Sequence, residues 1–305
     1  EQRRQLAERL RDEILAAGMA KDLFYVDIGL ADELDRELLV ERHLISRQLA
    51  DVSHSRGVAI SPSETVAIMV NEEDHLRLQV LRSGLELVEA MAEISRIDDL
   101  LEERLHYAFH PRFGYLTACP TNVGTGLRVS VMLHLPALKL SGKIEQAFRA
   151  ARDMRLAIRG LYGEGTEATG DFFQVSNQTT LGKSEGQIVQ EFSERIVPDL
   201  IEYERRARLS LLARQRVAVE DKICRANALL RAARTISSKE TMYLLSLLRW
   251  GVTAGRVEGV PLKTINELFL LTQPAHLQVL LSRSMSPQER AEARADYIRR
   301  RFETN

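Results

Sequence analysis

The sequence has few cysteines and almost no net charge. It contains only two cysteines, Cys119 and Cys224, among 305 residues. Two cysteines do not provide the disulfide framework typical of small secreted proteins, so we expect a reducing, cytoplasmic compartment. The formal net charge is −1, which excludes an overall positive field for binding nucleic acid.

Long apolar runs and several common motifs are also absent. No run approaches the roughly 20 apolar residues of a membrane-spanning helix, and the N-terminus has no signal-peptide pattern, so we expect no membrane partner. The Gly-x-x-x-x-Gly-Lys-Ser/Thr motif of a P-loop does not occur, nor does an internal repeat. A content of 45% hydrophobic and 28% charged residues is typical of a globular protein with one large or two ordinary domains.

The segment 115–126 combines a thiol with a polar turn. Cys119 lies at the end of a predicted strand, and Asn122, Gly124 and Gly126 follow it. Asparagine and glycine adopt the left-handed backbone that a tight turn or a close approach to a ligand requires. The same pattern also fits an ordinary hairpin that carries a buried cysteine, so other motifs must decide between the two.

The second strand of this predicted hairpin, residues 128–135, has two different faces. Period-two alternation places apolar residues on one face and Arg128, Ser130 and Met132 on the other. A thiol at the end of one strand and an arginine at the start of the next can therefore converge on one site.

Acidic residues follow another predicted strand, residues 63–70. Glu72, Glu73 and Asp74 come directly after it, and Arg77 lies a few residues further on. Such a run is usually a solvated turn. A carboxylate at the end of a strand can instead hold a guanidinium group by paired hydrogen bonds and accept its proton.

Helical and strand patterns segregate along the chain, which is typical of the α+β class. We expect strands at 24–28, 63–70, 155–159 and 171–176. We expect helices at 3–17, 84–105 and 142–153, and from about 186 to 234. Further helices begin near 237, 261 and 286, where Ser237 and Ser286 each open a capping box.

These segments resemble the phosphagen (guanidino) kinase superfamily. Its members carry Cys-Pro-Ser/Thr-Asn-Leu/Val-Gly-Thr around a reactive cysteine, and the chain has Cys-Pro-Thr-Asn-Val-Gly-Thr at 119–125. Residues 71–77 and the glycine-rich stretch 159–167 match the family in the same order. With Ser-Asn-Gln at 176–178 and Leu-Gly-Lys-Ser-Glu at 181–185, the resemblance covers residues 1–210.

Within the superfamily, the chain is most similar to the bacterial protein-arginine kinases. The resemblance implies an α+β fold with an antiparallel sheet flanked by helices. It also implies a phosphotransferase domain at 1–210 and an all-helical C-terminal domain at 211–305, where the subgroup forms homodimers.

The resemblance assigns three residues to catalysis. Glu73 and Glu164 would orient the substrate guanidinium, and one of them would take its proton. Cys119, as a thiolate favoured by the Thr121 hydroxyl and nearby arginines, would lie against the same group. Glu167 is a neighbouring acid with no expected role.

The resemblance also implies ATP and Mg²⁺. Three arginines would clamp the phosphates through planar donors, and Mg²⁺ would bridge phosphate oxygens with few protein ligands. His43 occupies the position that the family places against adenine, although a partly buried structural histidine fits equally well. The residues expected at the nucleotide are Arg77, Arg128, Ser130, Met132, Arg159 and His43.

The implied activity is ATP-dependent phosphorylation of arginine side chains in proteins. The implied partners are proteins with exposed arginine, an activator protein and the protease or chaperone machinery of protein quality control. One alternative is a phosphagen kinase for free arginine, which the helical residues 211–305 disfavour because the small-molecule enzymes end soon after the catalytic domain. Another alternative is a silent phosphoarginine-binding adaptor, which would bind nucleotide without turnover.

Both ends of the chain depart from the family pattern. The sequence opens with Glu1, without the upstream Ser-Arg-Ile-Arg-like segment whose arginines hold ATP phosphates, and this favours the adaptor slightly. Near the C-terminus, Arg290 and Arg294 match a regulatory phosphoarginine-binding motif, Arg-Asp-x-x-Arg-Ala, in which Ala291 replaces the acid. A solvated basic helix face is the simpler interpretation there.

Overall fold

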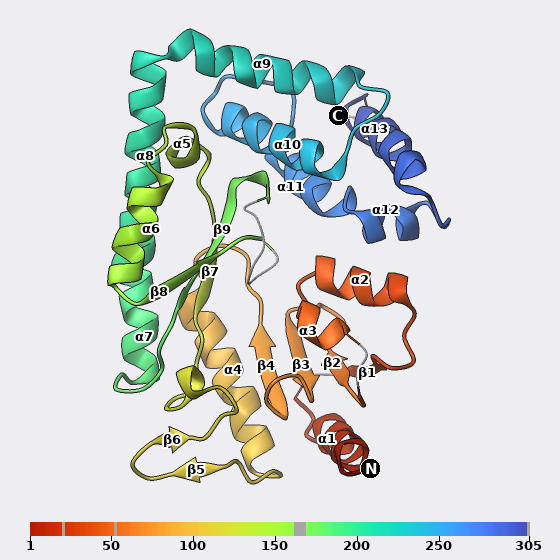
Figure 1. The fold of residues 1–305 in the computed structure, drawn as a ribbon, viewed down its shortest axis with the longest axis vertical. Helices are drawn as coiled ribbons and strands as arrows, with labels where there is room; N and C mark the ends of the chain where they lie inside the picture. Colours follow the sequence, from red (N-terminus) through yellow and green to blue (C-terminus); the bar gives the residue numbers. More distant parts are fainter. Residues whose placement is uncertain (20–21, 52–53, 162–168, 304–305) are drawn as a thin grey trace. The chain divides into compact units, whose positions relative to one another are not determined.

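The computed structural model describes residues 1–19, 22–51, 54–161 and 169–303 (Figure 1). The chain forms two compact units. The first contains Glu1–Val131, Arg155–Ala157 and Ser176–Pro198, and the second contains Met132–Met154, Ile158–Val175 and Asp199–Asn305.

The first unit is built around a four-stranded antiparallel sheet in the order β1-β2-β3-β4. The strands are β1 (Phe24–Asp27), β2 (Gly57–Ile60), β3 (Val66–Val70) and β4 (Leu76–Val80). The unit also contains α1 (Gln2–Ala16), α2 (Glu33–Glu41), α3 (Arg47–Ala50), α4 (Leu87–Glu102), β5 (Phe109–His110), β6 (Gly114–Tyr115), the short 3₁₀ turn Pro120–Asn122 and α7 (Glu185–Glu191).

Helices cover both faces of this sheet, so β3 is buried along its whole length. Ile68 and Val70 belong to the core cluster formed with α1 and α4. Met69, which points to the opposite face, packs in the cluster that contains Leu49 of α3. Burial on two faces explains why β3 reads as a continuous apolar run and not as an alternating one.

The hairpin predicted at residues 115–135 is wrong. β6 pairs with β5, in the register Phe109↔Tyr115. The second predicted strand is β7 (Ser130–His134), which belongs to a separate three-stranded sheet in the order β7-β9-β8. Pro120 starts the 3₁₀ turn between them, and because proline has no N–H it cannot continue a strand ladder.

The three-stranded sheet is completed by β8 (Leu156–Arg159) and β9 (Phe172–Asn177), both predicted from the sequence. The helices of the second unit are α5 (Pro136–Leu140), α6 (Ile144–Asp153), α8 (Val197–Arg214), α9 (Arg216–Ala232), α10 (Ser238–Thr253), α11 (Leu262–Leu271), α12 (Pro274–Leu280) and α13 (Pro287–Glu303). A π-helical turn, Phe192–Ile196, precedes α8. The predicted domain boundary at residue 210 lies inside α8.

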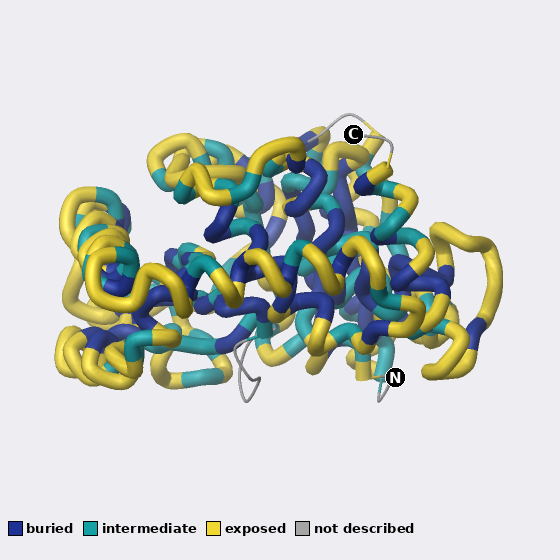
Figure 2. The backbone as a smooth tube through the Cα atoms, turned by 90° about the horizontal axis from the view of Figure 1, so that it is seen from above, coloured by how far each residue is buried: buried dark blue, intermediate teal, exposed yellow. Residues whose placement is uncertain are grey.

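Most helices alternate buried and exposed residues along their length, as amphipathic helices do (Figure 2). α10 is the exception, since Leu245, Leu248 and Trp250 are fully buried and α9 and α11 both pack against it. The predicted caps are confirmed: the Ser237 side chain accepts from Glu240 N at 3.1 Å, and the Ser286 side chain accepts from Glu289 N at 3.3 Å.

The α+β prediction, with antiparallel strands and a helical C-terminal region, is confirmed. Of the helices in the described ranges, none is both long and apolar enough to cross a lipid bilayer.

Candidate active site

Cys119 lies in a loop that is folded tightly on itself. Its Sγ is 3.0 Å from the Thr121 hydroxyl. The Thr117 hydroxyl donates to the Cys119 carbonyl at 2.7 Å, and Asn122 N donates to the same oxygen at 3.0 Å. The thiol is therefore held in a fixed place while it stays partly accessible to solvent.

Arg128 is tied to this loop. Its guanidinium donates to Asn122 Oδ1 at 3.0 Å. The thiol and the arginine that sequence analysis singled out are thus brought together by local hydrogen bonds, although they do not belong to one hairpin.

Residues far along the chain brace the same loop. Asn177 Oδ1 accepts from Val129 N at 2.8 Å, and its Nδ2 donates to the Leu127 carbonyl at 3.0 Å. The Thr180 hydroxyl donates to the Val123 carbonyl at 2.8 Å. Asn177 belongs to the Ser-Asn-Gln stretch that matched the family, but its bracing role was missed, because no local pattern links it to Val129.

Gly124 is required by the geometry of the loop. Its φ is +121°, and a Cβ there would lie 2.7 Å from the Thr180 carbonyl oxygen. Gly114 faces it and has a φ of +77°. A Cβ on Gly114 would clash, because it would lie 2.4 Å from the Gly124 carbonyl oxygen. Two backbone segments approach at this point, which only glycine permits.

The acidic turn after β3 is attached directly to the cysteine loop. Ala118 N donates to Asp74 Oδ1 at 2.6 Å. Glu73 precedes Asp74 and Cys119 follows Ala118, so two predicted catalytic residues lie on neighbouring segments. The Glu73 residue is exposed. The linking role of Asp74 was not predicted; its place in the acidic run was the only signal.

Arg77, on β4, lies beside this turn. It donates to Glu72 Oε1 at 2.9 Å, and the Glu72 side chain is only 5% exposed while that of Arg77 is 47% exposed. Glu72 therefore holds the guanidinium at the surface, and this pairing was also missed by sequence analysis.

His43 follows α2 in a left-handed conformation, with a φ of +59°. Its carbonyl accepts from Gln79 Nε2 at 2.7 Å. Burial lowers the pKa of His43 below its usual 6.5, which favours a neutral ring at pH 7.

The remaining predicted nucleotide residues lie on β7 and β8. On β7, Ser130 is partly buried, and Met132 is 37% exposed and precedes the buried Leu133. Arg159 is the last residue of β8 and is partly buried. Glu164 and Glu167 lie outside the described residues.

His134, two residues after Met132 on β7, is hydrogen-bonded to α10. Its Nδ1 accepts from the Arg249 guanidinium at 2.9 Å, so Nε2 carries the proton and donates to the Ser246 hydroxyl at 2.8 Å. Ser246 in turn donates to Asp171 Oδ2 at 2.6 Å. Burial, together with the charges of Arg249 and Arg208, lowers the pKa of His134 well below 6.5.

Arg290 and Arg294 lie on α13. Arg294 is 2% exposed and donates to the carbonyls of Thr272 at 2.7 Å and Ile236 at 3.0 Å. Arg290 donates to the Met285 carbonyl at 2.7 Å. Through these bonds both arginines connect α13 to the segments around it.

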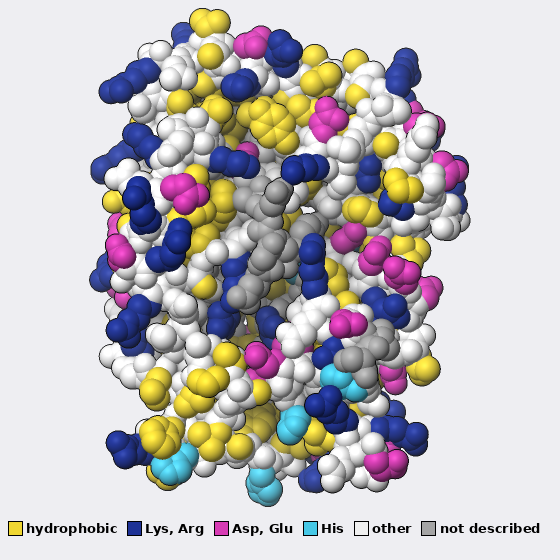
Figure 3. Space-filling view, viewed as in Figure 1, with side chains coloured by type: hydrophobic (Ala, Val, Ile, Leu, Met, Phe, Trp, Pro, Cys, Tyr) yellow, Lys and Arg dark blue, Asp and Glu magenta, His cyan; other side chains and the backbone are white. Residues whose placement is uncertain are grey.

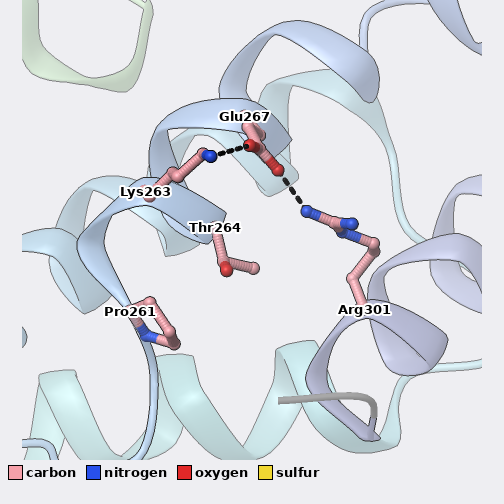
Figure 4. Close-up of a pocket in the computed structure, with 5 residues that line it drawn as sticks. All are labelled: Pro261, Lys263, Thr264, Glu267 and Arg301. Carbon is pink, nitrogen blue, oxygen red and sulfur yellow. Dashed lines mark hydrogen bonds and ion pairs between the residues drawn. The ribbon is translucent and has the colours of Figure 1, made fainter.

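A separate pocket of about 340 Å³ lies in the helical part of the second unit (Figure 4). It is lined by Pro261, Lys263, Thr264, Glu267 and Arg301. Glu267 is the one carboxylate among these lining residues, and it pairs with both Lys263 and Arg301. Of the predicted catalytic residues that the structure describes, neither Glu73 nor Cys119 lines it.

Two family models match this chain. The ATP:guanido phosphotransferase C-terminal catalytic domain matches residues 5–207, and the Protein-arginine kinase McsB C-terminal domain matches residues 216–305. The first covers the sheets and the braced cysteine loop, and the second covers the helices from α9 onward.

Individual relatives agree with these matches. A protein named protein-arginine kinase from Symbiobacterium thermophilum is 51% identical over 269 residues, which cover 88% of this chain and 76% of that protein. One of the same name from Halothermothrix orenii is 43% identical over 298 residues, covering 98% and 85%. The solved structure of the duplicated taurocyamine kinase from Schistosoma mansoni, with bound transition state analog components, aligns with a TM-score of 0.57 at 27% identity, covering 67% of this chain and 29% of that one.

Proposed function

Because the chain belongs to the ATP:guanido phosphotransferase family, we propose that it transfers the γ-phosphoryl group of ATP to arginine side chains in proteins. The relatives named protein-arginine kinase and the match of residues 216–305 to the C-terminal domain of that subgroup support this choice of acceptor. The hydrogen bond from Ala118 N to Asp74 carries the proposal, because it joins the turn of Glu73 to the loop of Cys119.

A guanidinium is a poor nucleophile because it is protonated, with a pKa above roughly 12. In the proposed reaction, the Glu73 carboxylate binds the substrate guanidinium and accepts one of its protons. The freed nitrogen attacks the γ-phosphorus, an N–P bond forms, and the bond to the ADP oxygen breaks. Cys119 Sγ and the Thr121 hydroxyl, 3.0 Å apart, form the adjoining wall of the site. Glu164 is proposed as the second carboxylate.

The phosphates are proposed to bind to Arg77, Arg128 and Arg159, whose planar guanidinium groups match phosphate oxygens. His43, Ser130 and Met132 are proposed at the nucleoside. Mg²⁺, when bound, would neutralise phosphate charge. Phosphate oxygens would supply most of its ligands, since Mg²⁺ is usually bound through substrate phosphates and only one or two carboxylates.

The remaining assignments follow the family. We propose a phosphotransferase domain at 1–210 and a helical domain at 211–305, a division supported by family matches that end at 207 and begin at 216. A homodimer through the helical domain, an activator protein and a protease or chaperone partner are proposed on the same basis. For Arg290 and Arg294 to bind phosphoarginine, Arg294 would have to break its hydrogen bonds to the carbonyls of Thr272 and Ile236.

Transfer of label from γ-labelled ATP tests the proposal. An unfolded, arginine-rich protein is the acceptor in one reaction and free arginine in another. We expect acid-labile label on the protein alone, since N–P bonds hydrolyse in acid. Label on free arginine alone would indicate a phosphagen kinase. Nucleotide binding without any transfer would indicate a silent adaptor.

A further inference from the structure

An exposed aromatic surface lies next to the cysteine loop. Phe109, Phe113 and Leu116 are 57%, 41% and 47% exposed, although all three are large and apolar. Figure 3 shows hydrophobic side chains gathered over β5 and β6, at the lower left of the view. We call residues 109–116 the aromatic hairpin. Grouped exposed apolar side chains of this kind mark a binding surface more often than single ones do.

Ring contacts and a main-chain hydrogen bond hold the aromatic hairpin together. Phe109 and Tyr115 pack edge to face with ring centroids 5.3 Å apart, and Tyr107 packs on Tyr115 at 6.0 Å. Leu116 N donates to the Ala108 carbonyl at 2.8 Å. Preformed aromatic side chains lose little conformational freedom on binding and are common energetic anchors of interfaces.

The hairpin is continuous with the candidate active site. Tyr115 N donates to the Gly124 carbonyl at 2.9 Å, and Gly124 N donates back at 3.3 Å. Leu116 precedes Cys119 by three residues, a span of at most about 10 Å of extended chain. A ligand with an arginine at Cys119 could therefore place a residue roughly three positions away on the hairpin.

Carboxylates border the hairpin on one side. The Tyr115 hydroxyl donates to Glu102 Oε1 at 3.5 Å. Partial burial raises the pKa of Tyr115, and so do the negative charges of Glu102, Asp98 and Glu185. Arg104, two residues beyond Glu102, is paired with Glu13 at 2.8 Å. We call Asp98, Glu102 and Glu185 the acidic border.

We propose that the aromatic hairpin and its acidic border bind the polypeptide that flanks the target arginine, in particular an apolar or aromatic residue about three positions away. This rests on the proposed function and names its substrate class as unfolded polypeptide with mixed apolar and basic composition. A folded protein hides its apolar side chains, and free arginine has none, so both would miss these contacts. The carboxylates also attract additional arginines of the same segment. The Phe113 ring already has the Arg112 guanidinium over it, 5.5 Å from the ring centroid.

Two labelled peptides test the proposal. Each has a single central arginine and lysine-containing flanks; one has phenylalanine three positions from the arginine, and the other has serine there. We expect the wild-type chain to bind the phenylalanine peptide about tenfold more tightly by fluorescence anisotropy, and to phosphorylate it with a correspondingly lower KM. Phe113→Ser and Phe109→Ser should remove that difference, while Phe109→Leu should retain most of it.

The control is Leu30→Ser, which changes a side chain that is 87% exposed elsewhere in the same unit. Circular dichroism melting confirms that each variant is folded, and Phe113→Ser alone suffices if Phe109→Ser does not fold. Equal affinity of both peptides for the wild-type chain, or unchanged preference in both serine variants, overturns the proposal. Binding preference without phosphorylation of either peptide would overturn the proposed function and leave the docking surface standing.

Discussion

At the scale of single residues, the proposed chemistry depends on a few side chains that are held by main-chain hydrogen bonds. Asp74 accepts from Ala118 N at 2.6 Å, which places Glu73 and Cys119 on neighbouring segments. Glu73 is exposed, so it is accessible to a substrate that arrives from solvent. Its neighbours fix the backbone on which it lies, while its own carboxylate is available for the guanidinium.

Glu73→Gln should lower kcat for phosphoryl transfer by at least about 10²-fold, because the amide cannot accept a proton from the guanidinium. The melting temperature should not change, since the side chain is exposed and the substitution preserves its shape. Glu89→Gln, at an exposed position of α4, is the control and should retain full activity. Wild-type rates in Glu73→Gln would remove the assignment.

A second prediction concerns His134, whose pKa is well below 6.5 because of burial and the nearby arginine charges. Above pH 6.5 the ring is neutral in both the folded and the unfolded chain. Below that value the unfolded chain takes up a proton and the folded chain does not. The free energy of unfolding should therefore decrease as the pH is lowered below 6.5, by up to about 1.4 kcal/mol per pH unit, until the folded-state pKa is reached.

His134→Gln tests this, because glutamine can bond to Ser246 and Arg249 but does not titrate. Urea unfolding at pH 7.5 and 5.5 should show a larger loss of stability for the wild-type chain than for the variant. An equal loss in both would mean that His134 is not the group responsible.

At the scale of elements, the cysteine loop is a connection that distant segments hold in place. Asn177 at the end of β9 and Thr180 after it bond to Leu127, Val129 and Val123. The loop lacks a strand partner along most of its length, so these bonds replace a sheet ladder. Its close approach to Thr180 is possible only because residue 124 is glycine.

Gly124→Ala should destabilise the protein by about 2–4 kcal/mol, because a Cβ would meet the Thr180 carbonyl at 2.7 Å and the φ of +121° suits glycine alone. Gly126→Ala is the matched control: its φ is +65°, but no atom lies within 4 Å of the added Cβ, so about 1 kcal/mol is expected. Urea unfolding compares the two. Equal losses would mean that the contact with Thr180 relaxes without cost.

Elements with strong periodicity were predictable from the sequence, and those defined by distant partners were not. α1, α4 and β3 follow their apolar patterns closely. The predicted hairpin failed because alternation reveals which faces are apolar but not which strand is the neighbour, and Pro120 ends the ladder.

The same limit applies to the candidate site. Cys119 and Arg128 are recognisable from residue type and spacing. The contact between Asp74 and Ala118 spans 44 residues, and that between Asn177 and Val129 spans 48. Neither has a local signal, because chain folding alone brings those segments together.

At the scale of the whole molecule, the chain combines a guanidino phosphotransferase region with a helical C-terminal region. In the second, α10 is buried on nearly all sides and Arg294 bonds to carbonyls on two other segments. This helical region is well packed, and it also bonds to the three-stranded sheet, because Ser246 and Arg249 of α10 contact His134 of β7. Its presence is the main reason to expect a protein acceptor and not a small molecule.

The most direct test uses one unfolded acceptor protein in two versions, the natural sequence and a version in which every arginine is replaced by lysine. Both are incubated with the full chain and γ-labelled ATP, and the label is assigned to residues by mass spectrometry under non-acidic conditions. We predict label on arginine nitrogen in the first version and none in the second. Equal labelling of the lysine version, or label on serine, threonine or tyrosine, would contradict a protein-arginine kinase.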